Sequence, residues 1–238
     1  MNMTIFRFAI IRGLRNRATL IFNCVLPIVL IFVRPLWEGG TQTPFGGGNI
    51  TAFGLLLMTM WGGAFLMSQG ILNDRTSGSI VRILSAPVTT LNYLTQNLLA
   101  FMVPLTIQIT LVSTLGMILY GWGIQFALAL FAGYVIFTMS AIALSFAWNC
   151  LFKSKETSFS SFSALITFGS FLSGGLIPIE LFPSPLQYVG AIFPAYWAIR
   201  GIRVFSDYGF AFEYFISLLA MLLITAICLL YGGKRRIV

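Results

Sequence analysis

The stretch NDRTSGSIVRILSAPVTTLN, residues 73–92, is a polar interruption between two long apolar runs. It carries Asp74 and Arg75, whereas the chain from Ile83 to Phe152 has no charged residue. A helix needs about 20 predominantly apolar residues to cross a bilayer, so that run alone is long enough for two crossings joined by a turn. Residues 73–92 therefore predict a segment in water between two membrane-spanning helices.

The composition places the whole chain in the same class. Of the 238 residues, 58% are hydrophobic and only 8% are charged, whereas a soluble domain carries about 25% charged residues. The apolar runs are continuous rather than alternating, which favours helices over the strands of a membrane barrel. We therefore predict an all-α, multi-pass membrane protein that forms a single transmembrane domain over residues 1–238.

The composition also argues against several kinds of chemistry. Histidine is absent, which removes histidine acid–base catalysis and histidine metal ligands. The three cysteines are odd in number and lie in or beside apolar runs, so a disulfide framework is not expected. The chain has neither a GxxxxGK[ST] phosphate loop nor a GxSxG nucleophile elbow. We expect no catalytic residue, no metal site and no cofactor on this chain.

Six apolar segments predict six transmembrane helices, which places both termini on one side. Most of the 14 lysines and arginines fall on that side, and basic residues favour the cytoplasm. Both termini and residues 73–92 are therefore expected to be cytoplasmic, and the net charge of +8 indicates orientation rather than nucleic-acid binding. The predicted spans are residues 18–33, with an extension to 37, then 50–72, 94–119, 124–151, 158–176 and 212–231.

Two further segments flank or interrupt the spans. Residues 1–17 hold four arginines and no acid, with Phe6, Ile10 and Leu14 spaced four apart. This spacing predicts an amphipathic helix along the cytoplasmic surface. Residues 177–208 are broken by prolines, and irregular backbone at membrane depth must be covered by protein or water. They predict a segment that dips into the membrane from outside and returns.

Glu180 lies within that broken segment. One interpretation is a functional acid inside the membrane. The other, which we favour, is a position near the outer surface, where Glu180 pairs with Arg200 or Arg203.

Residues 79–86 predict a short amphipathic helix that ends before Pro87, because proline disfavours helix at the preceding residue. Thr90 is then the expected cap of the next helix. Two interpretations remain open: a helix lying on the membrane surface, or a docking helix whose polar face fits a groove in a cytoplasmic partner. The apolar face comprises Ile80, Ile83 and Leu84, and the polar face comprises Arg75, Ser79 and Arg82.

The fifth apolar segment carries a stripe of small and hydroxyl-bearing residues at steps of three and four, which places them on one side of a helix. Such residues let helices pack closely in lipid and form hydrogen bonds between helices. The stripe predicts either packing against another helix or subunit, or the lining of a substrate route. Its members are Ser160, Ser163, Thr167, Ser170 and Gly174.

Two motifs stand out in the chain. After the second predicted span an acidic residue is followed by Arg, Gly, Leu and Pro, which are Asp74, Arg75, Gly78, Leu84 and Pro87. Near the end, SG and two spaced prolines precede a proline that is followed by aromatic residues and Arg; these are Ser173, Gly174, Pro178, Pro183, Phe193, Pro194, Tyr196 and Arg200. In these motifs, and over essentially its whole length, the chain resembles the membrane subunits of ATP-binding-cassette (ABC) type 2 exporters. In that family Glu is commoner than Asp at the first position.

The resemblance implies a role for each unusual segment. Residues 1–17 would be an interface helix, and residues 73–92 a cytoplasmic coupling segment that contacts a separate ABC ATPase subunit. Residues 177–208 would be paired re-entrant helices at the outer face. The implied coupling residues are Asp74, Arg75, Gly78, Ser79, Arg82, Leu84 and Pro87, and the implied outer-gate residues are Pro178, Glu180, Pro183, Pro194, Tyr196 and Arg200.

The resemblance further implies a permease subunit in a bacterial or archaeal cell membrane. Two permease subunits, identical or paralogous, would pair and export a hydrophobic or amphipathic drug, peptide or lipid, while ATP and Mg bind the partner ATPase. Alternatives are export of a polysaccharide or lipid-linked glycan, a permease conferring immunity to a peptide toxin, and an ATP-independent channel or structural subunit. A neighbouring gene for a soluble chain with a phosphate loop would favour the exporter.

Overall fold

In the computed structural model of the protein, residues 3–15, 19, 21–37, 49–80 and 89–234 are described. All regular secondary structure in these ranges is helical, which confirms the all-α prediction. The elements are α1 (Met3–Arg15), the π-helix η1 (Ile21–Val25), α3 (Leu26–Trp37), α4 (Asn49–Thr76), α6 (Thr90–Tyr120), α7 (Ile124–Asn149), α8 (Lys155–Leu172), the 3-10 helix η2 (Ile179–Leu181), α9 (Ser184–Gly190), α10 (Pro194–Tyr208) and α11 (Phe212–Lys234).

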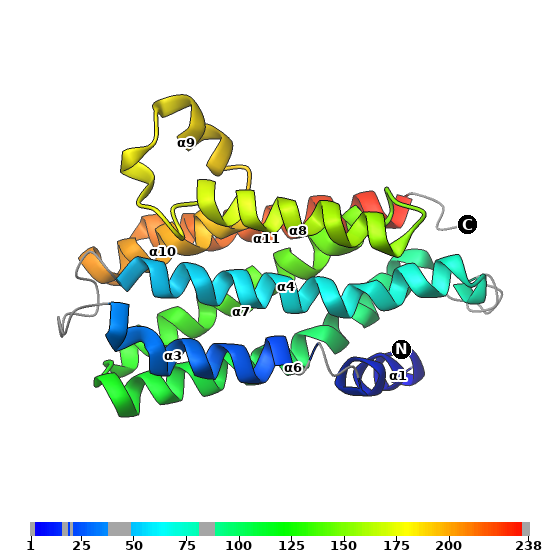
Figure 1. Ribbon diagram of the computed structural model, residues 1–238, viewed down its shortest axis with the longest axis horizontal. Helices are drawn as coiled ribbons and strands as arrows, with labels where there is room; N and C mark the ends of the chain where they lie inside the picture. The colour runs from blue at the N-terminus through cyan, green and yellow to red at the C-terminus, as the bar shows by residue number, and fades with distance from the viewer. Residues whose placement is uncertain (1–2, 16–18, 20, 38–48, 81–88, 235–238) are drawn as a thin grey trace.

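The long helices run along one axis of the molecule and alternate in direction from one to the next (Figure 1). In the same view α1 is seen nearly end-on, so it lies across the long helices rather than along them. The segment around α9 projects from the flank of the bundle (Figure 1). The fold is therefore an up-and-down helical bundle with one crosswise helix and one lateral projection.

Four helices within the described residues are long and apolar enough to cross a membrane, and they match the predicted second, third, fourth and sixth spans. The predicted first span corresponds to η1 and α3, and α3 has only 12 residues. The predicted fifth span corresponds to α8, which has 18 residues and begins with Lys155 and Glu156. It stops at Leu172 rather than at residue 176, because Gly174 turns the chain with φ 81°.

Helix α7 lies at the centre of the bundle and α11 at its edge. Helix α7 packs against α4, α6, α8, α10 and α11, and 61% of its apolar window is buried, compared with 22% for α11. In the core, the ring of Trp61 makes edge contacts with Phe137, Phe162 and Phe193, at centroid distances of 6.1, 6.2 and 6.3 Å. The side chains facing outward on α11 are mainly apolar, as expected of a surface in contact with lipid.

Hydroxyl groups of one helix form hydrogen bonds with neighbouring helices. Each donates to a backbone carbonyl of another helix, which satisfies a polar group in an apolar interior. The bonds run from Tyr134 to Phe53 (2.9 Å), from Tyr214 to Ala129 (2.8 Å), from Ser140 to Met221 (2.8 Å) and from Tyr120 to Ile31 (2.6 Å).

One local prediction is corrected, and the packing of α1 adds a detail. The cap of α6 is Thr89 rather than Thr90, because the Thr89 side chain accepts a hydrogen bond from the backbone N–H of Asn92 at 3.3 Å. On α1 the most buried positions are Ala9 and Gly13, and the bulkier Phe6 and Ile10 are only half-buried. Small residues let α1 approach the bundle more closely than the spacing of its large side chains indicates.

Candidate functional site

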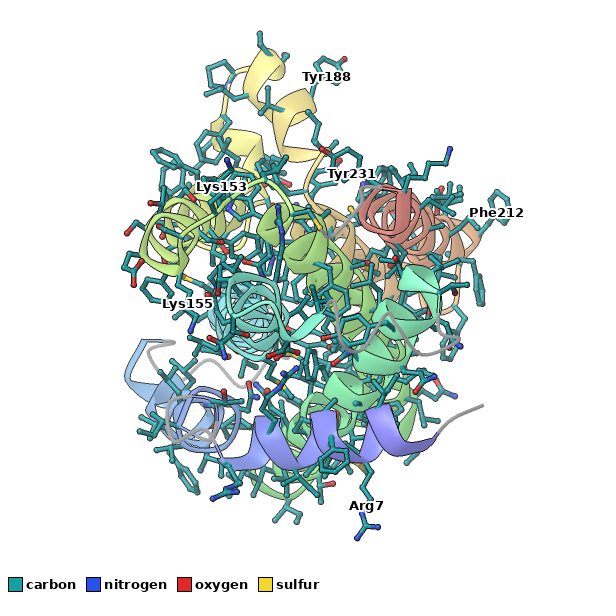
Figure 2. The ribbon with its side chains drawn as sticks, turned by 90° about the vertical axis from the view of Figure 1, so that its right-hand side faces the viewer. Arg7, Lys153, Lys155, Tyr188, Phe212 and Tyr231 are labelled. Atoms are coloured by element: carbon teal, nitrogen blue, oxygen red, sulfur yellow. The ribbon has the colours of Figure 1, made fainter. Side chains whose placement is uncertain are left out.

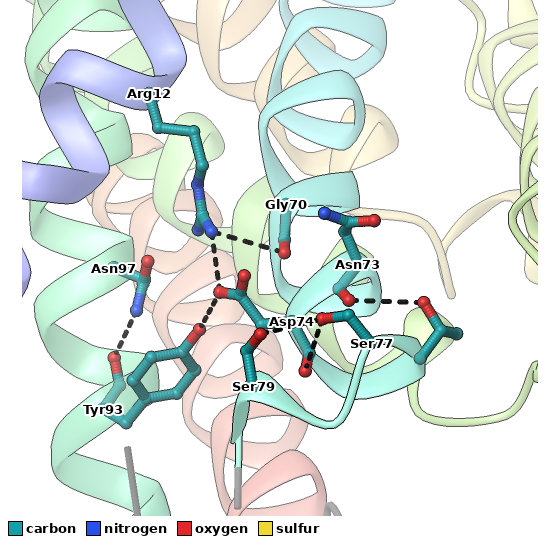
Figure 3. A network of polar contacts seen from close by, with 9 residues as sticks. Arg12, Gly70, Asn73, Asp74, Ser77, Ser79, Tyr93 and Asn97 are labelled. Carbon is teal, nitrogen blue, oxygen red and sulfur yellow. Dashed lines mark hydrogen bonds and ion pairs between the residues drawn. The ribbon is translucent and has the colours of Figure 1, made fainter. Parts of the chain in front are cut away.

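The cytoplasmic end predicted for the second span, the C-terminal end of α4, gathers two networks of polar contacts. In the first, the Arg12 guanidinium of α1 lies 2.6 Å from the Asp74 carboxylate of α4. The Tyr93 hydroxyl of α6 donates to the same carboxylate oxygen at 2.8 Å (Figure 3). Asp74 therefore joins three helices through one side chain.

Arg12 is held in place by a second contact. Its guanidinium also donates to the carbonyl of Gly70, one turn before Asp74, at 3.4 Å. A Cβ at Gly70 would lie 2.7 Å from the guanidinium carbon, so a glycine makes room for this arginine. Burial lowers the pKa of Arg12, but its hydrogen bond and attraction to Asp74 outweigh burial, and the pKa is raised overall. Arg12 therefore keeps its charge throughout the physiological pH range.

Arg75 points to a different neighbour. Its guanidinium donates to the carbonyls of Asn149, Cys150 and Phe152, at 3.2, 3.2 and 3.5 Å. The last carbonyls of a helix lack partners within the helix, and a cation at this end is favoured by the helix dipole. Arg75 thus caps α7 with its side chain.

The second network centres on Asn149, whose side chain is 2% exposed. Its amide nitrogen donates to the Ser68 hydroxyl of α4 at 2.8 Å. Its amide oxygen accepts from the Ser158 hydroxyl of α8 at 2.7 Å and from Gln69 of α4 at 3.3 Å. Helices α4, α7 and α8 are therefore joined by a buried amide with both ends hydrogen-bonded.

The predicted coupling residues lie at and beyond this end of α4. Gly78 has φ 71°, no described residue lies within 4 Å of where its Cβ would be, and helical backbone resumes at Ser79 and Ile80. The Ser79 hydroxyl lies 3.0 Å from that of Ser77. Arg75 precedes the Gly78 turn and contacts α7, so it does not extend the polar face predicted for the helix that follows. Arg82, Leu84 and Pro87 lie outside the described residues.

The stripe on α8 divides into an exposed and a buried part. Ser160 and Thr167 are exposed and Ser163 is half-buried, whereas Ser170 and Gly174 are buried. The Ser170 hydroxyl is among the buried polar groups that have no hydrogen-bond partner in the described residues. One end of the stripe therefore packs inside this chain, and the other end is open to lipid or to another subunit.

The prolines of the broken segment separate short helices. Pro178 precedes η2, Pro183 precedes α9, and Pro194 begins α10. Proline fits these positions because the first residues of a helix have no internal partner for their N–H groups.

Glu180 of this segment is paired, as predicted from the sequence. Glu180 forms an ion pair with Arg203, which confirms one of the two partners expected. Arg200 instead lies over the ring of Trp197, 5.5 Å from its centroid, and the Tyr196 ring packs against the same tryptophan. Such a cation–aromatic contact stabilises an arginine for which the described residues provide no ion pair.

Sequence reasoning missed the two most connected residues of the site, Arg12 and Asn149. Arg12 falls on the polar side of α1 in a helical projection, but its long side chain reaches past the backbone to Asp74. Asn149 is one of few amides in a long apolar run. That isolation could have indicated that its side chain forms hydrogen bonds inside the bundle. Within the described residues, no group of three His, Cys, Asp or Glu side chains could hold a metal ion.

The fold and site together are those of a helical membrane protein whose polar contacts concentrate at one end of a central bundle. A family model described as ABC-2 family transporter protein matches residues 40–233. The chain belongs to this family of ABC transporter membrane proteins. It is thus a transport component, and the family implies association with an ABC ATPase. No curated protein matches the chain.

Proposed function

We propose that this chain is the permease subunit of an ATP-driven exporter for a hydrophobic or amphipathic substrate such as a drug, peptide or lipid. It works with a separate cytoplasmic ABC ATPase, which binds ATP and Mg, and with a second permease subunit in a cell membrane. Residues 73–92 form the coupling segment, and residues 177–208 form the outer gate. The family supports the transport class, and the geometry below supports the finer assignments.

The observation that carries this proposal is the pair of networks at the end of α4. Asp74 and Arg75 lie at the start of the coupling segment, and their contacts reach α1, α6 and α7. Asn149 extends the same connections to α8. A displacement of residues 73–92 by a partner would therefore move the ends of five helices together, rather than the end of α4 alone.

Coupling requires more than a mechanical connection. The ATPase drives a change in the permease only if it binds two permease conformations with unequal affinity. The coupling residues lie where a bound ATPase could favour one of the two conformations. Gly78 separates the end of α4 from the helical turn that starts at Ser79, so this turn can change its orientation relative to α4. ATP binding would draw two partner ATPases together and tilt α4 and α6 through this turn.

In the proposed topology the chain crosses the membrane six times, and both termini lie in the cytoplasm. Helices α3 and α8 run alongside the longer helices (Figure 1), which supports their assignment as the first and fifth spans. The helix ends at Arg15, Arg75, Lys155 and Lys234 lie at one end of the alternating bundle. Basic residues favour the cytoplasmic side, so this end is assigned to the cytoplasm.

The projection around α9 supports a second permease subunit. It exposes large apolar side chains, among them Leu181 (73%), Tyr188 (78%) and Ile192 (71%). A protein surface of this kind is stable when it is covered by lipid or by another chain. In the proposed transporter it meets the second subunit at the outer gate.

The experiment compares two glycines that share one backbone conformation. Gly78 has φ 71° and Gly121 has φ 63°, and among the described residues a Cβ at either position would have no neighbour within 4 Å. Gly78→Val and Gly121→Val therefore impose a similar backbone strain, of about 1–2 kcal/mol, the first just after α4 and the second at the C-terminal end of α6. We expect Gly78→Val to lower substrate-stimulated ATPase activity and export in reconstituted vesicles. Gly121→Val is expected to retain both.

The assay uses the permease co-purified with its ABC ATPase and reconstituted in lipid. Gly78→Asn is a graded control, because asparagine adopts positive φ more readily than valine. Unchanged export and ATPase stimulation in Gly78→Val would contradict the coupling role. Transport without any ATPase would instead favour an ATP-independent channel.

A further inference from the structure

A cavity of about 650 Å³ lies between α1 and the ends of α4 and α6. On the α1 side it is lined mainly by apolar residues, including Phe8 and Ile11, together with Arg12 and Arg15. On the bundle side it is lined by polar groups, including Tyr93. The volume falls within the range of about 300–1,000 Å³ that is typical of small-molecule sites.

The charge of the lining is not balanced. Among the described residues that line the cavity, Asp74 is the one acid, and it is paired with Arg12. Arg15 is exposed, and no ion pair of Arg15 is found in the part of the chain that the structure describes. The cavity therefore presents an uncompensated positive charge beside an apolar wall, which fits an amphipathic ligand with an anionic head.

The position of α1 favours a lipid from the bilayer as the ligand. This helix lies across the bundle axis near one end (Figure 1), as a helix at a membrane surface does. Phe8 and Ile11 are 67% and 43% exposed, so the apolar side of the cavity is continuous with surface that lipid would cover. A lipid reaches such a cavity directly from the bilayer, whereas a free phosphate ion would leave the apolar wall unused.

We propose that this cavity is a binding site for one anionic phospholipid. Its phosphate lies against Arg15, beside the Arg12–Asp74 pair, and an acyl chain packs against Phe8 and Ile11. The site does not depend on coupling to an ATPase, so this proposal stands apart from the assignment of residues 73–92. A bound lipid would fix α1 against the bundle and thereby support the contact between Arg12 and Asp74.

The test compares two arginines on the same helix. Arg15 lines the cavity, whereas Arg7 is exposed and points away from the bundle (Figure 2). Phosphatidylglycerol and phosphatidylcholine with identical acyl chains are added to the delipidated full-length protein, and the bound lipid is measured by native mass spectrometry. We expect wild type to retain phosphatidylglycerol selectively, and Arg15→Gln to bind it about fivefold more weakly. Arg7→Gln should bind it as wild type does.

A second variant tests the apolar part of the site without changing charge. Ile11→Trp places a larger side chain in the cavity and should reduce retention of phosphatidylglycerol, while Arg7→Gln does not. Equal losses in Arg15→Gln and Arg7→Gln would show diffuse surface attraction and overturn the proposal. Equal retention of both lipids by wild type, or undiminished binding by Ile11→Trp, would also overturn it. Circular dichroism and gel filtration confirm that each variant is folded.

Discussion

Asn149 shows how a single amide joins three helices in surroundings without water. Both of its polar ends are used, and its partners Ser68 and Ser158 are themselves fully buried. In lipid the alternative to such bonds is an unsatisfied polar group, although interhelical hydrogen bonds contribute only about 0.6–2 kcal/mol each. Gln108 of α6 is equally buried, but neither end of its amide has a hydrogen-bond partner within the described ranges.

We therefore expect the same substitution to have opposite effects at these two positions. Asn149→Leu leaves the hydroxyls of Ser68 and Ser158 without their shared partner and should destabilise the folded protein by about 1–2 kcal/mol. Gln108→Leu removes an amide that has no bond to lose and should be neutral or stabilising. Thermal unfolding of the purified protein in detergent measures both. A melting temperature for Asn149→Leu at or above that of wild type would contradict the role assigned to Asn149.

At the scale of the element, α8 divides the stripe of small residues between the inside and the outside of the chain. Ser170 is buried, whereas Thr167, one turn earlier, is exposed. A larger side chain at Ser170 must fit into packed surroundings, and overpacking costs about 1–3 kcal/mol. A larger side chain at Thr167 meets only lipid or a second subunit.

Accordingly, Ser170→Leu should lower the stability of the single chain, and Thr167→Leu should weaken subunit pairing or transport while stability is retained. Phe168→Leu is the control, because Phe168 is 65% exposed on the same helix but lies off the stripe. Cross-linking in membranes reports pairing, and thermal unfolding reports stability. Normal pairing and transport in Thr167→Leu would mean that the outer part of the stripe faces lipid.

The helices were more predictable than their contacts. Long apolar runs predicted α4, α6, α7 and α11 because the membrane demands length and hydropathy, which are properties of the sequence itself. The Glu180–Arg203 pair was foreseen because a charge near lipid requires a partner. The contact of Arg75 with α7 was not predicted. The sequence pattern placed Arg75 on the same helical face as Ser79, but the turn at Gly78 ends α4 between them, so the two residues do not share one continuous helix.

At the scale of the whole molecule, the proposed orientation places Lys153 and Tyr188 on opposite sides of the membrane. Both side chains are exposed, Lys153 between α7 and α8 and Tyr188 on α9 (Figure 2). Each can therefore be replaced by cysteine without loss of a buried contact. The labelling of each cysteine in intact cells then shows on which side of the membrane it lies.

In a cysteine-free background, Tyr188→Cys should react with a membrane-impermeant maleimide on intact cells. Lys153→Cys should react only after lysis, because positive charge holds its loop in the cytoplasm. Gel shifts of the labelled protein give the result. Labelling of Lys153→Cys on intact cells, with Tyr188→Cys protected, would reverse the proposed topology.

The ion pair between Arg12 and Asp74 also has a consequence for the order in which the protein is built. The two residues are 62 positions apart, and η1, α3 and most of α4 lie between them. A ribosome adds about 5–20 residues per second, so α1 is complete seconds before its partner is synthesised. Helix α1 therefore reaches its final position only after α4 is in place.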